Sequence, residues 1–117
     1  MNFDNFQVRT KAYGIRVLAL IDTLPQSFSY RRIYDQLMRS SLSVGANYRA
    51  ACRAKSKPDF ISKMGTVEEE CDESLYWMEI LVEAGIAQSE QLEDIVKEGR
   101  ELLAMVVASI ITARNRR

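Results

Sequence analysis

Apolar residues recur at intervals of three and four positions along nearly the whole chain, and only two prolines interrupt them. This spacing places apolar side chains on one face of an α-helix, whereas a half-buried strand would need strict alternation. The first such segment covers about residues 5–23 and ends before Pro25, which disfavours helical geometry at Leu24. Its seam consists of Phe3, Phe6, Thr10, Tyr13, Val17, Leu20 and Leu24. We therefore expect an all-α protein.

Three further segments show the same periodicity: about residues 30–53, a segment that follows Ser56 and continues to about residue 83, and one that begins near residue 89. Ser56 is a plausible N-cap with Asp59 three residues later, Gly85 is well placed to end the third helix, and Ser89 can cap the fourth. Short connections predict an antiparallel up-down-up-down four-helix bundle, one domain over residues 1–117.

The middle of the second segment is rich in small and polar residues that form helices less readily than alanine. They are Ser40, Ser41, Ser43, Gly45 and Asn47. Small residues inside a helix allow a neighbouring helix to approach closely, so we expect tight packing here. Asn47 lies near the apolar face and should need a hydrogen-bond partner if it is buried.

The chain lacks histidine and the other motifs on which many catalytic sites depend. It contains no histidine, which excludes Ser-His-Asp and Cys-His sites and argues against a di-iron bundle centre. The acidic run at residues 68–73 would spread around a helix, and no glycine-rich phosphate loop is present. We expect no enzymatic activity, no cofactor and no bound metal.

The two cysteines, Cys52 and Cys71, are not part of a CxxC pair, and residues 1–13 lack a signal-peptide pattern. These features predict a cytoplasmic protein with reduced thiols. The longest mostly apolar run, residues 102–111, is about half of the roughly 20 residues needed to cross a bilayer. We therefore expect no membrane insertion.

The zero net charge hides an asymmetry between the two halves of the chain. Residues 1–57 carry ten basic and three acidic residues, and residues 58–117 carry six basic and thirteen acidic ones, which gives +7 and −7. Helices that pair by charge would explain this pattern, and so would a nucleic-acid surface. The candidate phosphate contacts are five basic residues in the second half of the second helix and in the loop after it: Arg39, Arg49, Arg53, Lys55 and Lys57.

The fourth helix is apolar nearly all round between residues 102 and 111. Its expected core stripe already includes Leu102, Val106 and Ile110, so other apolar residues must point elsewhere. Exposed apolar area of this kind usually marks a partner interface. We therefore predict self-association through Met105, Val107 and Ile111.

Residues 36–47, QLMRSSLSVGAN, resemble the signature of the "four helix bundle protein" family. The resemblance continues through YRAACRAKS at residues 48–56, Asp59-Phe60, and EECDESLYW at residues 69–77. The family includes proteins encoded by intervening sequences in large-subunit ribosomal RNA genes and the accessory variability determinants of diversity-generating retroelements. The zero net charge of this chain differs from the strongly basic surface of the retroelement branch.

The resemblance implies a four-helix protomer that assembles into a homopentameric barrel. It implies nucleic-acid and reverse-transcriptase binding for the retroelement branch, and it assigns no activity to the intervening-sequence branch. We favour an oligomeric scaffold of the intervening-sequence type, with weak or partner-assisted binding of RNA or DNA. The alternative is a protein-binding module whose acidic third and fourth helices dock a basic partner such as a reverse transcriptase.

Overall fold

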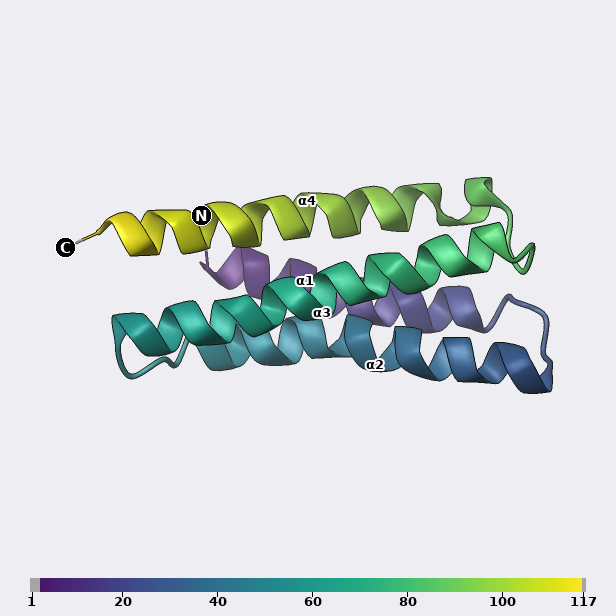
Figure 1. The fold of residues 1–117 in the computed structure, drawn as a ribbon, viewed down its shortest axis with the longest axis horizontal. Coiled ribbons are helices and arrows are strands. Elements are labelled where there is room, and N and C mark those ends of the chain that lie inside the picture. The colour runs from purple at the N-terminus through teal and green to yellow at the C-terminus, as the bar shows by residue number, and fades with distance from the viewer. Residues whose placement is uncertain (1–2, 117) are drawn as a thin grey trace.

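The computed structural model describes residues 3–116, and four α-helices account for most of them (Figure 1). Helix α1 spans Phe3–Ile21, α2 spans Phe28–Ala51, α3 spans Lys57–Glu83 and α4 spans Ser89–Asn115. No strand occurs in this part of the chain. The all-α class and the four predicted helices are therefore confirmed.

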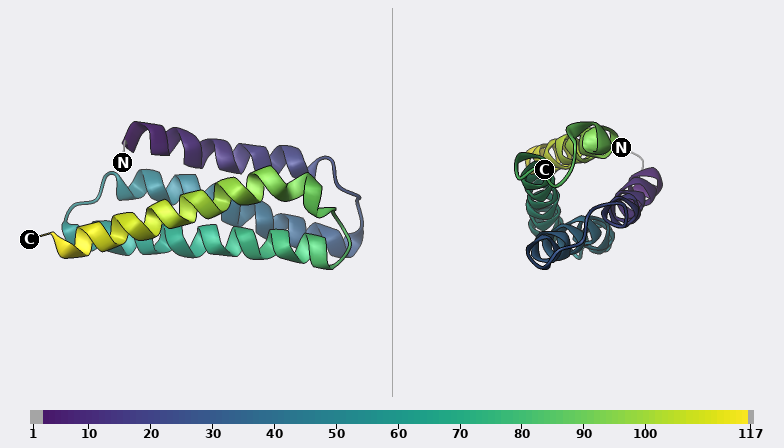
Figure 2. Two further views of the ribbon diagram at one scale, coloured as in Figure 1. Left: turned by 90° about the horizontal axis from the view of Figure 1, so that it is seen from above. Right: turned by 90° about the vertical axis from the view of Figure 1, so that its right-hand side faces the viewer.

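The helices lie side by side in an elongated molecule of 50 × 23 × 21 Å. The α1–α2 and α3–α4 loops lie at one end, and the α2–α3 loop lies at the other (Figure 1). Helices that are consecutive in sequence pack against each other, whereas α1 and α4 approach each other less closely (Figure 2). Helix α4 runs obliquely, so its carboxyl-terminal end lies over the beginning of α3 (Figure 2).

Local hydrogen bonds fix the helix ends. The Ser56 hydroxyl accepts from the Asp59 backbone N–H at 3.2 Å, so Ser56 is the N-cap of α3 as predicted. Gly85 has φ +74° and follows the last residues of α3, where the Ile86 N–H donates to the Leu81 carbonyl at 2.9 Å. This arrangement satisfies an otherwise free carbonyl, and only glycine adopts it without strain.

Several predicted boundaries differ from the observed ones by one or two residues, and α1, expected at about residues 5–23, spans Phe3–Ile21. The N-cap of α4 is Gln88 rather than Ser89, because the Gln91 side-chain oxygen accepts from the Gln88 N–H at 2.7 Å. Helix α2 ends at Ala51, two residues before Arg53, and the Arg53 and Ala54 N–H groups instead form turn hydrogen bonds. Arg53 therefore lies in the α2–α3 loop.

The predicted seam of α1 is largely buried in the core, with Leu20 only half-buried. The side chain of Phe3 lies outside the described residues. A polar contact crosses the core, where the Tyr13 hydroxyl lies 2.7 Å from Ser74 Oγ and joins α1 to α3. Both residues are fully buried, so this contact satisfies two polar groups at the centre of the bundle.

The prediction of close packing around the middle of α2 is confirmed. A Cβ atom at Gly45 would lie 3.2 Å from backbone atoms of Thr10 and Lys11, so α1 and α2 nearly touch there. Asn47 donates to the Ser43 carbonyl at 2.9 Å, which provides the partner that its position required. The hydroxyls of Ser40 and Ser41 also bond to carbonyls of their own helix.

Candidate nucleic-acid interface

A pocket rich in cationic side chains lies where α2 ends and α3 begins. Its volume is about 410 Å³. We call it the basic pocket, and its lining residues are Ala46, Arg49, Ala50, Arg53, Lys55, Asp59 and Lys63. Four of these side chains are basic and one is acidic, so the pocket carries a formal charge of +3. This charge attracts an anionic group such as a phosphate.

The fold of the α2–α3 loop brings these residues together. Arg49 lies in the last turn of α2, and Arg53 and Lys55 follow in the loop. The loop is held by Ser56, which caps α3, and by the Asp59 carboxylate, which accepts from the Lys55 N–H at 3.0 Å. Because the last turn of α2 and the first turn of α3 are both anchored, the cationic side chains start from fixed backbone positions.

Asp59 is the anionic member of the basic pocket. Its Oδ1 atom accepts from Lys63 Nζ at 2.6 Å, one helical turn away. The hydrogen bond from the Lys63 ammonium lowers the pKa of Asp59, and the Lys55 N–H acts in the same direction. Asp59 is therefore ionised at neutral pH, and its negative charge offsets part of the positive charge of the pocket.

The structure brings together three of the five predicted phosphate contacts: Arg49, Arg53 and Lys55. Lys57 does not line the pocket, and its Nζ instead donates to the Arg116 carbonyl at the end of α4. Lys63 completes the pocket and was missed by the sequence analysis. The signal that points to it is its i,i+4 spacing from Asp59, which places both residues on one face of α3.

Arg39 lies away from the basic pocket and is engaged in ion pairs with α3. Its guanidinium contacts Glu70 at 3.0 Å and also contacts Glu73. These carboxylates raise the pKa of Arg39, chiefly through the hydrogen bond to Glu73. The guanidinium is therefore committed to an internal contact between α2 and α3.

The three residues predicted to form an oligomer interface differ in their surroundings. Met105 packs against the core and accepts from Arg9 Nη1 through its sulfur at 3.3 Å, so it faces α1. Val107 is half-buried, and Ile111 is 52% exposed. Of the three residues, Ile111 therefore exposes the largest fraction of its surface on the outer face of α4.

A second apolar stripe lies on the outer face of α1 and was not recognised in the sequence. It consists of Val8, Ala12, Ile15 and Ala19, all of them exposed. We call it the α1 outer stripe. Its spacings of 4, 3 and 4 are those of a heptad seam, so it is detectable as a second periodic pattern on the opposite face of the helix. The exposed fractions of Val8 and Ile15 are 66% and 58%.

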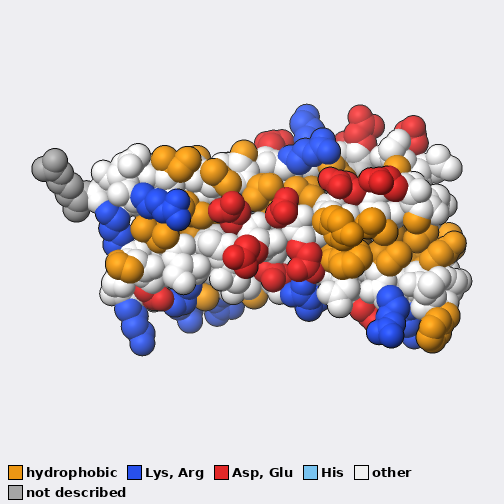
Figure 3. Space-filling model, in the orientation of Figure 1, with side chains coloured by type: hydrophobic (Ala, Val, Ile, Leu, Met, Phe, Trp, Pro, Cys, Tyr) orange, Lys and Arg blue, Asp and Glu red, His pale blue; other side chains and the backbone are white. Residues whose placement is uncertain are grey.

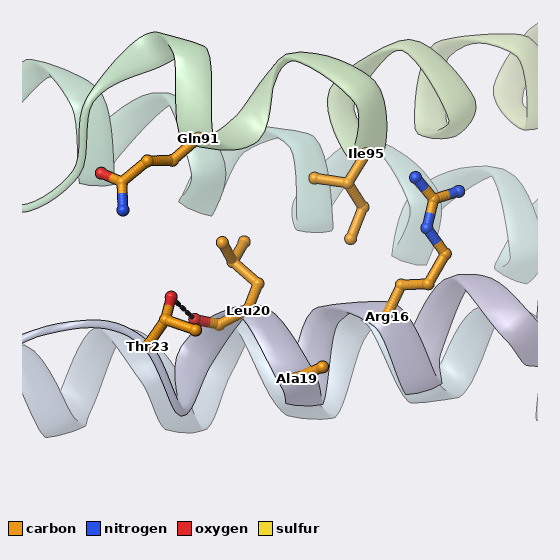
Figure 4. Close-up of a pocket in the computed structure, with 6 residues that line it drawn as sticks. All are labelled: Arg16, Ala19, Leu20, Thr23, Gln91 and Ile95. Atoms are coloured by element: carbon orange, nitrogen blue, oxygen red, sulfur yellow. Dashed lines mark hydrogen bonds between the residues drawn. The ribbon is translucent and has the colours of Figure 1, made fainter.

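A groove of about 550 Å³ separates α1 from the beginning of α4, next to this stripe. In Figure 4, Leu20 and Ile95 extend toward each other from the two helices, and Arg16 lies at one end of the groove. Farther along the same helix pair, Glu98 accepts from Arg9 through two hydrogen bonds of 2.6 and 3.1 Å. This bidentate contact lowers the pKa of Glu98 and holds α1 and α4 together.

The described helices include none that is long and apolar enough to cross a membrane. A family model described as 23S rRNA-intervening sequence protein matches residues 5–108. The chain is also similar to a solved structure from Bacteroides thetaiotaomicron, described as a protein of unknown function from the S23 ribosomal protein family. The two chains share 28% identity and a TM-score of 0.84, with 94% of this chain and 98% of the other covered. No curated protein matches the chain significantly.

Proposed function

The chain belongs to the 23S rRNA-intervening sequence protein family, and from this premise we propose that it is a non-enzymatic, self-associating scaffold. Each copy contributes one basic pocket that contacts the phosphates of RNA or DNA weakly. The resemblance noted in the sequence adds the expectation of five copies. The observation that carries the nucleic-acid part is the convergence of four cationic side chains from α2, the following loop and α3 on one cavity.

Phosphate is an anion that this pocket suits. Arginine presents a planar set of donors that matches a phosphate group, and lysine adds a mobile point charge. Arg49 lies in the last turn of α2 and Arg53 in the loop that follows, and both line the basic pocket. Contacts of this kind position a nucleic-acid backbone without reading its sequence.

Binding by a single pocket is expected to be weak. The chain has no net charge, and Asp59 offsets part of the local positive field. Several copies in one assembly would repeat the pocket, and linked sites bind a continuous strand more tightly than one site does. Tight nucleic-acid binding therefore depends on the assembly, whereas the assembly does not depend on nucleic acid.

Self-association is supported by the apolar area that one chain leaves in water. The α1 outer stripe has no covering helix in the described chain, and Ile111 adds exposed apolar area on α4. A heptad seam that faces outward is suited to pack against a helix of another copy. We therefore place the interface on α1 and α4, at the opposite side of the protomer from the α2–α3 contact.

Filter binding at low salt with a labelled RNA tests the nucleic-acid part. The variant Arg49→Glu/Arg53→Glu should lose retention, because it converts two attractive charges of the pocket into repulsive ones. The matched control is Arg31→Glu/Arg32→Glu, which makes the same charge change at exposed positions near the start of α2. Binding at the basic pocket is contradicted if the wild-type protein retains no RNA. It is also contradicted if both variants lose retention equally.

A further inference from the structure

The basic pocket is one part of a larger cationic surface at the end of the bundle. Beyond the four cations that line the pocket, this end carries Lys57 at the start of α3, and Arg114 and Arg116 at the end of α4. All three are exposed. We call the whole set the basic end, and its members are Arg49, Arg53, Lys55, Lys57, Lys63, Arg114 and Arg116.

A contact between α3 and α4 brings the last of these cations to the others. The Lys57 ammonium donates to the Arg116 backbone carbonyl, which joins the start of α3 to the end of α4. Because α4 runs obliquely over the beginning of α3, its last turn lies at the same end of the molecule as the α2–α3 loop (Figure 2). Three helices and one loop therefore contribute cations to one end of the bundle.

The charge of the basic end is almost entirely positive. Residues 45–67 and 102–116, which carry it, contain seven basic residues and one acidic residue, Asp59. Of these seven cations, only Lys63 forms an ion pair within the described chain. Figure 3 shows basic side chains gathered at this end, whereas the acidic ones lie mainly farther along the molecule. Six positive charges are thus left to attract an anionic partner.

In the described part of the chain, the basic end has no exposed aromatic ring. Proteins that bind single strands combine a basic groove with exposed rings on which bases stack. The exposed aromatic residues are Phe28 and Tyr76, at 89% and 51% exposure. Phe28 begins α2 at the opposite end of the bundle, and Tyr76 lies about 29 Å along α3 from Lys57 at 1.5 Å per residue. At the basic end, Tyr48 is buried and Phe60 packs against the core.

A duplex presents what this surface can contact. Its bases are paired and stacked inside, and its outside offers two phosphate backbones with one negative charge per about 1.7 Å of axis. Across the 23 × 21 Å cross-section of the molecule this gives about 12 phosphates, enough for six cations when half of them face the protein. Resting on the proposed nucleic-acid function, we propose that the basic end binds the phosphate backbone of a nucleic-acid duplex in preference to a single strand.

Fluorescence anisotropy with nucleic acids of equal charge tests this preference. A labelled RNA duplex of about 12 base pairs and an unstructured RNA strand of about 24 nucleotides carry nearly the same number of phosphates. A DNA duplex of the same length separates a contact to phosphates from a contact to the RNA sugar. At low salt, the full chain should bind at least one duplex about fivefold or more tightly than the single strand, because the bases of the strand find no ring to stack on.

The variant Arg114→Ala/Arg116→Ala tests the part of the basic end that lies outside the pocket. Both side chains are exposed, and the Lys57 contact uses the Arg116 backbone carbonyl, so the variant removes two charges while keeping that contact. The slope of log Kobs against log salt for the duplex should become shallower by about 1.8, at about 0.9 per phosphate contact. The matched control Arg31→Ala/Arg32→Ala, at exposed positions near the start of α2, should leave the slope unchanged.

The proposal is overturned if the single strand binds as tightly as both duplexes, or if the two double variants change the slope equally. In either case, loss of RNA retention by Arg49→Glu/Arg53→Glu would still support the basic pocket and the proposed function. Absence of binding to all three nucleic acids would instead overturn both the duplex preference and the proposed nucleic-acid function.

Discussion

The Asp59 carboxylate lies 2.6 Å from the Lys63 ammonium, and both line the basic pocket. A carboxylate thus occupies a position beside the cation that would otherwise be free for a phosphate. The hydrogen bond from Lys63 lowers the pKa of Asp59, so this internal competitor stays charged throughout the neutral range. Asp59 therefore sets how strongly the pocket attracts an anion.

Replacement of Asp59 by asparagine should strengthen nucleic-acid binding. The substitution removes one negative charge and frees Lys63, while the asparagine oxygen can still accept from the Lys55 N–H. One more phosphate contact would steepen the dependence of log Kobs on log salt by about 0.9 for duplex DNA. Filter binding across a salt series measures this slope. An unchanged slope with Asp59→Asn would show that Lys63 does not reach the ligand.

Two glycines within helices should respond to alanine in opposite directions. At Gly45 the new methyl group would lie 3.2 Å from the α1 backbone, so Gly45→Ala should destabilise the fold by about 1–3 kcal/mol. At Gly65 nothing lies within 4 Å, so Gly65→Ala should stabilise it by about 0.5–1 kcal/mol through helix propensity. Urea unfolding of both variants measures the difference. Similar free energies of unfolding would contradict the close α1–α2 crossing.

Two buried tyrosines should respond differently to removal of the hydroxyl. Tyr13 bonds to Ser74 at 2.7 Å, so Tyr13→Phe leaves a buried serine with one partner fewer and should cost about 1 kcal/mol. Tyr48 is also fully buried, but its hydroxyl makes no hydrogen bond of good geometry in the described chain, and its polar neighbour is the weakly hydrogen-bonding Cys52 thiol. Tyr48→Phe should therefore leave stability unchanged or raise it by up to about 1 kcal/mol. Equal destabilisation by both variants in thermal melts would refute this contrast.

The stability of the protein should fall in alkaline solution. Burial raises the pKa of the Cys71 thiol to about 12 from its ordinary value of 9.0, so the folded chain keeps a proton that the unfolded chain releases. The associated stability is complete below pH 9 and is lost as the pH rises toward 12, at up to about 1.4 kcal/mol per pH unit. Burial also raises the pKa of Tyr13, which adds a second loss above about pH 10.

Urea unfolding between pH 8 and pH 11 measures this dependence. Cys71→Ala should flatten the profile between pH 9 and 10, whereas Cys52→Ala should not, because Cys52 is exposed. The assignment of this pH dependence to Cys71 would be contradicted if the free energy of unfolding of the wild-type protein did not change over this range. It would also be contradicted if Cys52→Ala, and not Cys71→Ala, flattened the profile.

Most of the fold follows from local sequence patterns. Each of these patterns involves residues only a few positions apart, so it can be read from the sequence before any tertiary contact is known. Examples are the heptad seams, the Ser56 N-cap and Gly85 at the end of α3. The α4 N-cap was misplaced because the last extended residue is Gln88, one position before Ser89, and the Gln91 side-chain oxygen accepts from its N–H. Where the backbone turns into a helix depends on such contacts, which periodicity does not encode.

The candidate site was predictable only where it is contiguous in sequence. Arg49, Arg53 and Lys55 lie within seven residues, and the structure keeps them together. The pairing of Arg39 with Glu70 and Glu73 depends on the alignment of α2 with α3. The recruitment of Lys63 depends on where α3 begins after the loop. Both are tertiary properties that composition and spacing leave open.

Charge introduced into the α1 outer stripe should disrupt the assembly. Ile15 is 58% exposed in one chain, so Ile15→Glu should cost a protomer little stability while placing a charge in the interface. Ile111→Glu tests the α4 side in the same way. Lys11→Glu is a control at an exposed position of α1 outside the stripe, and its assembly should remain intact.

The mass of the purified chain in solution tests the scaffold most directly. Light scattering at micromolar concentration should give a multiple of the 13.4 kDa protomer, about 67 kDa if five copies assemble. Ile15→Glu should shift this mass toward one protomer while Lys11→Glu should not. A wild-type mass of 13.4 kDa at micromolar concentration would contradict self-association and with it the proposed scaffold.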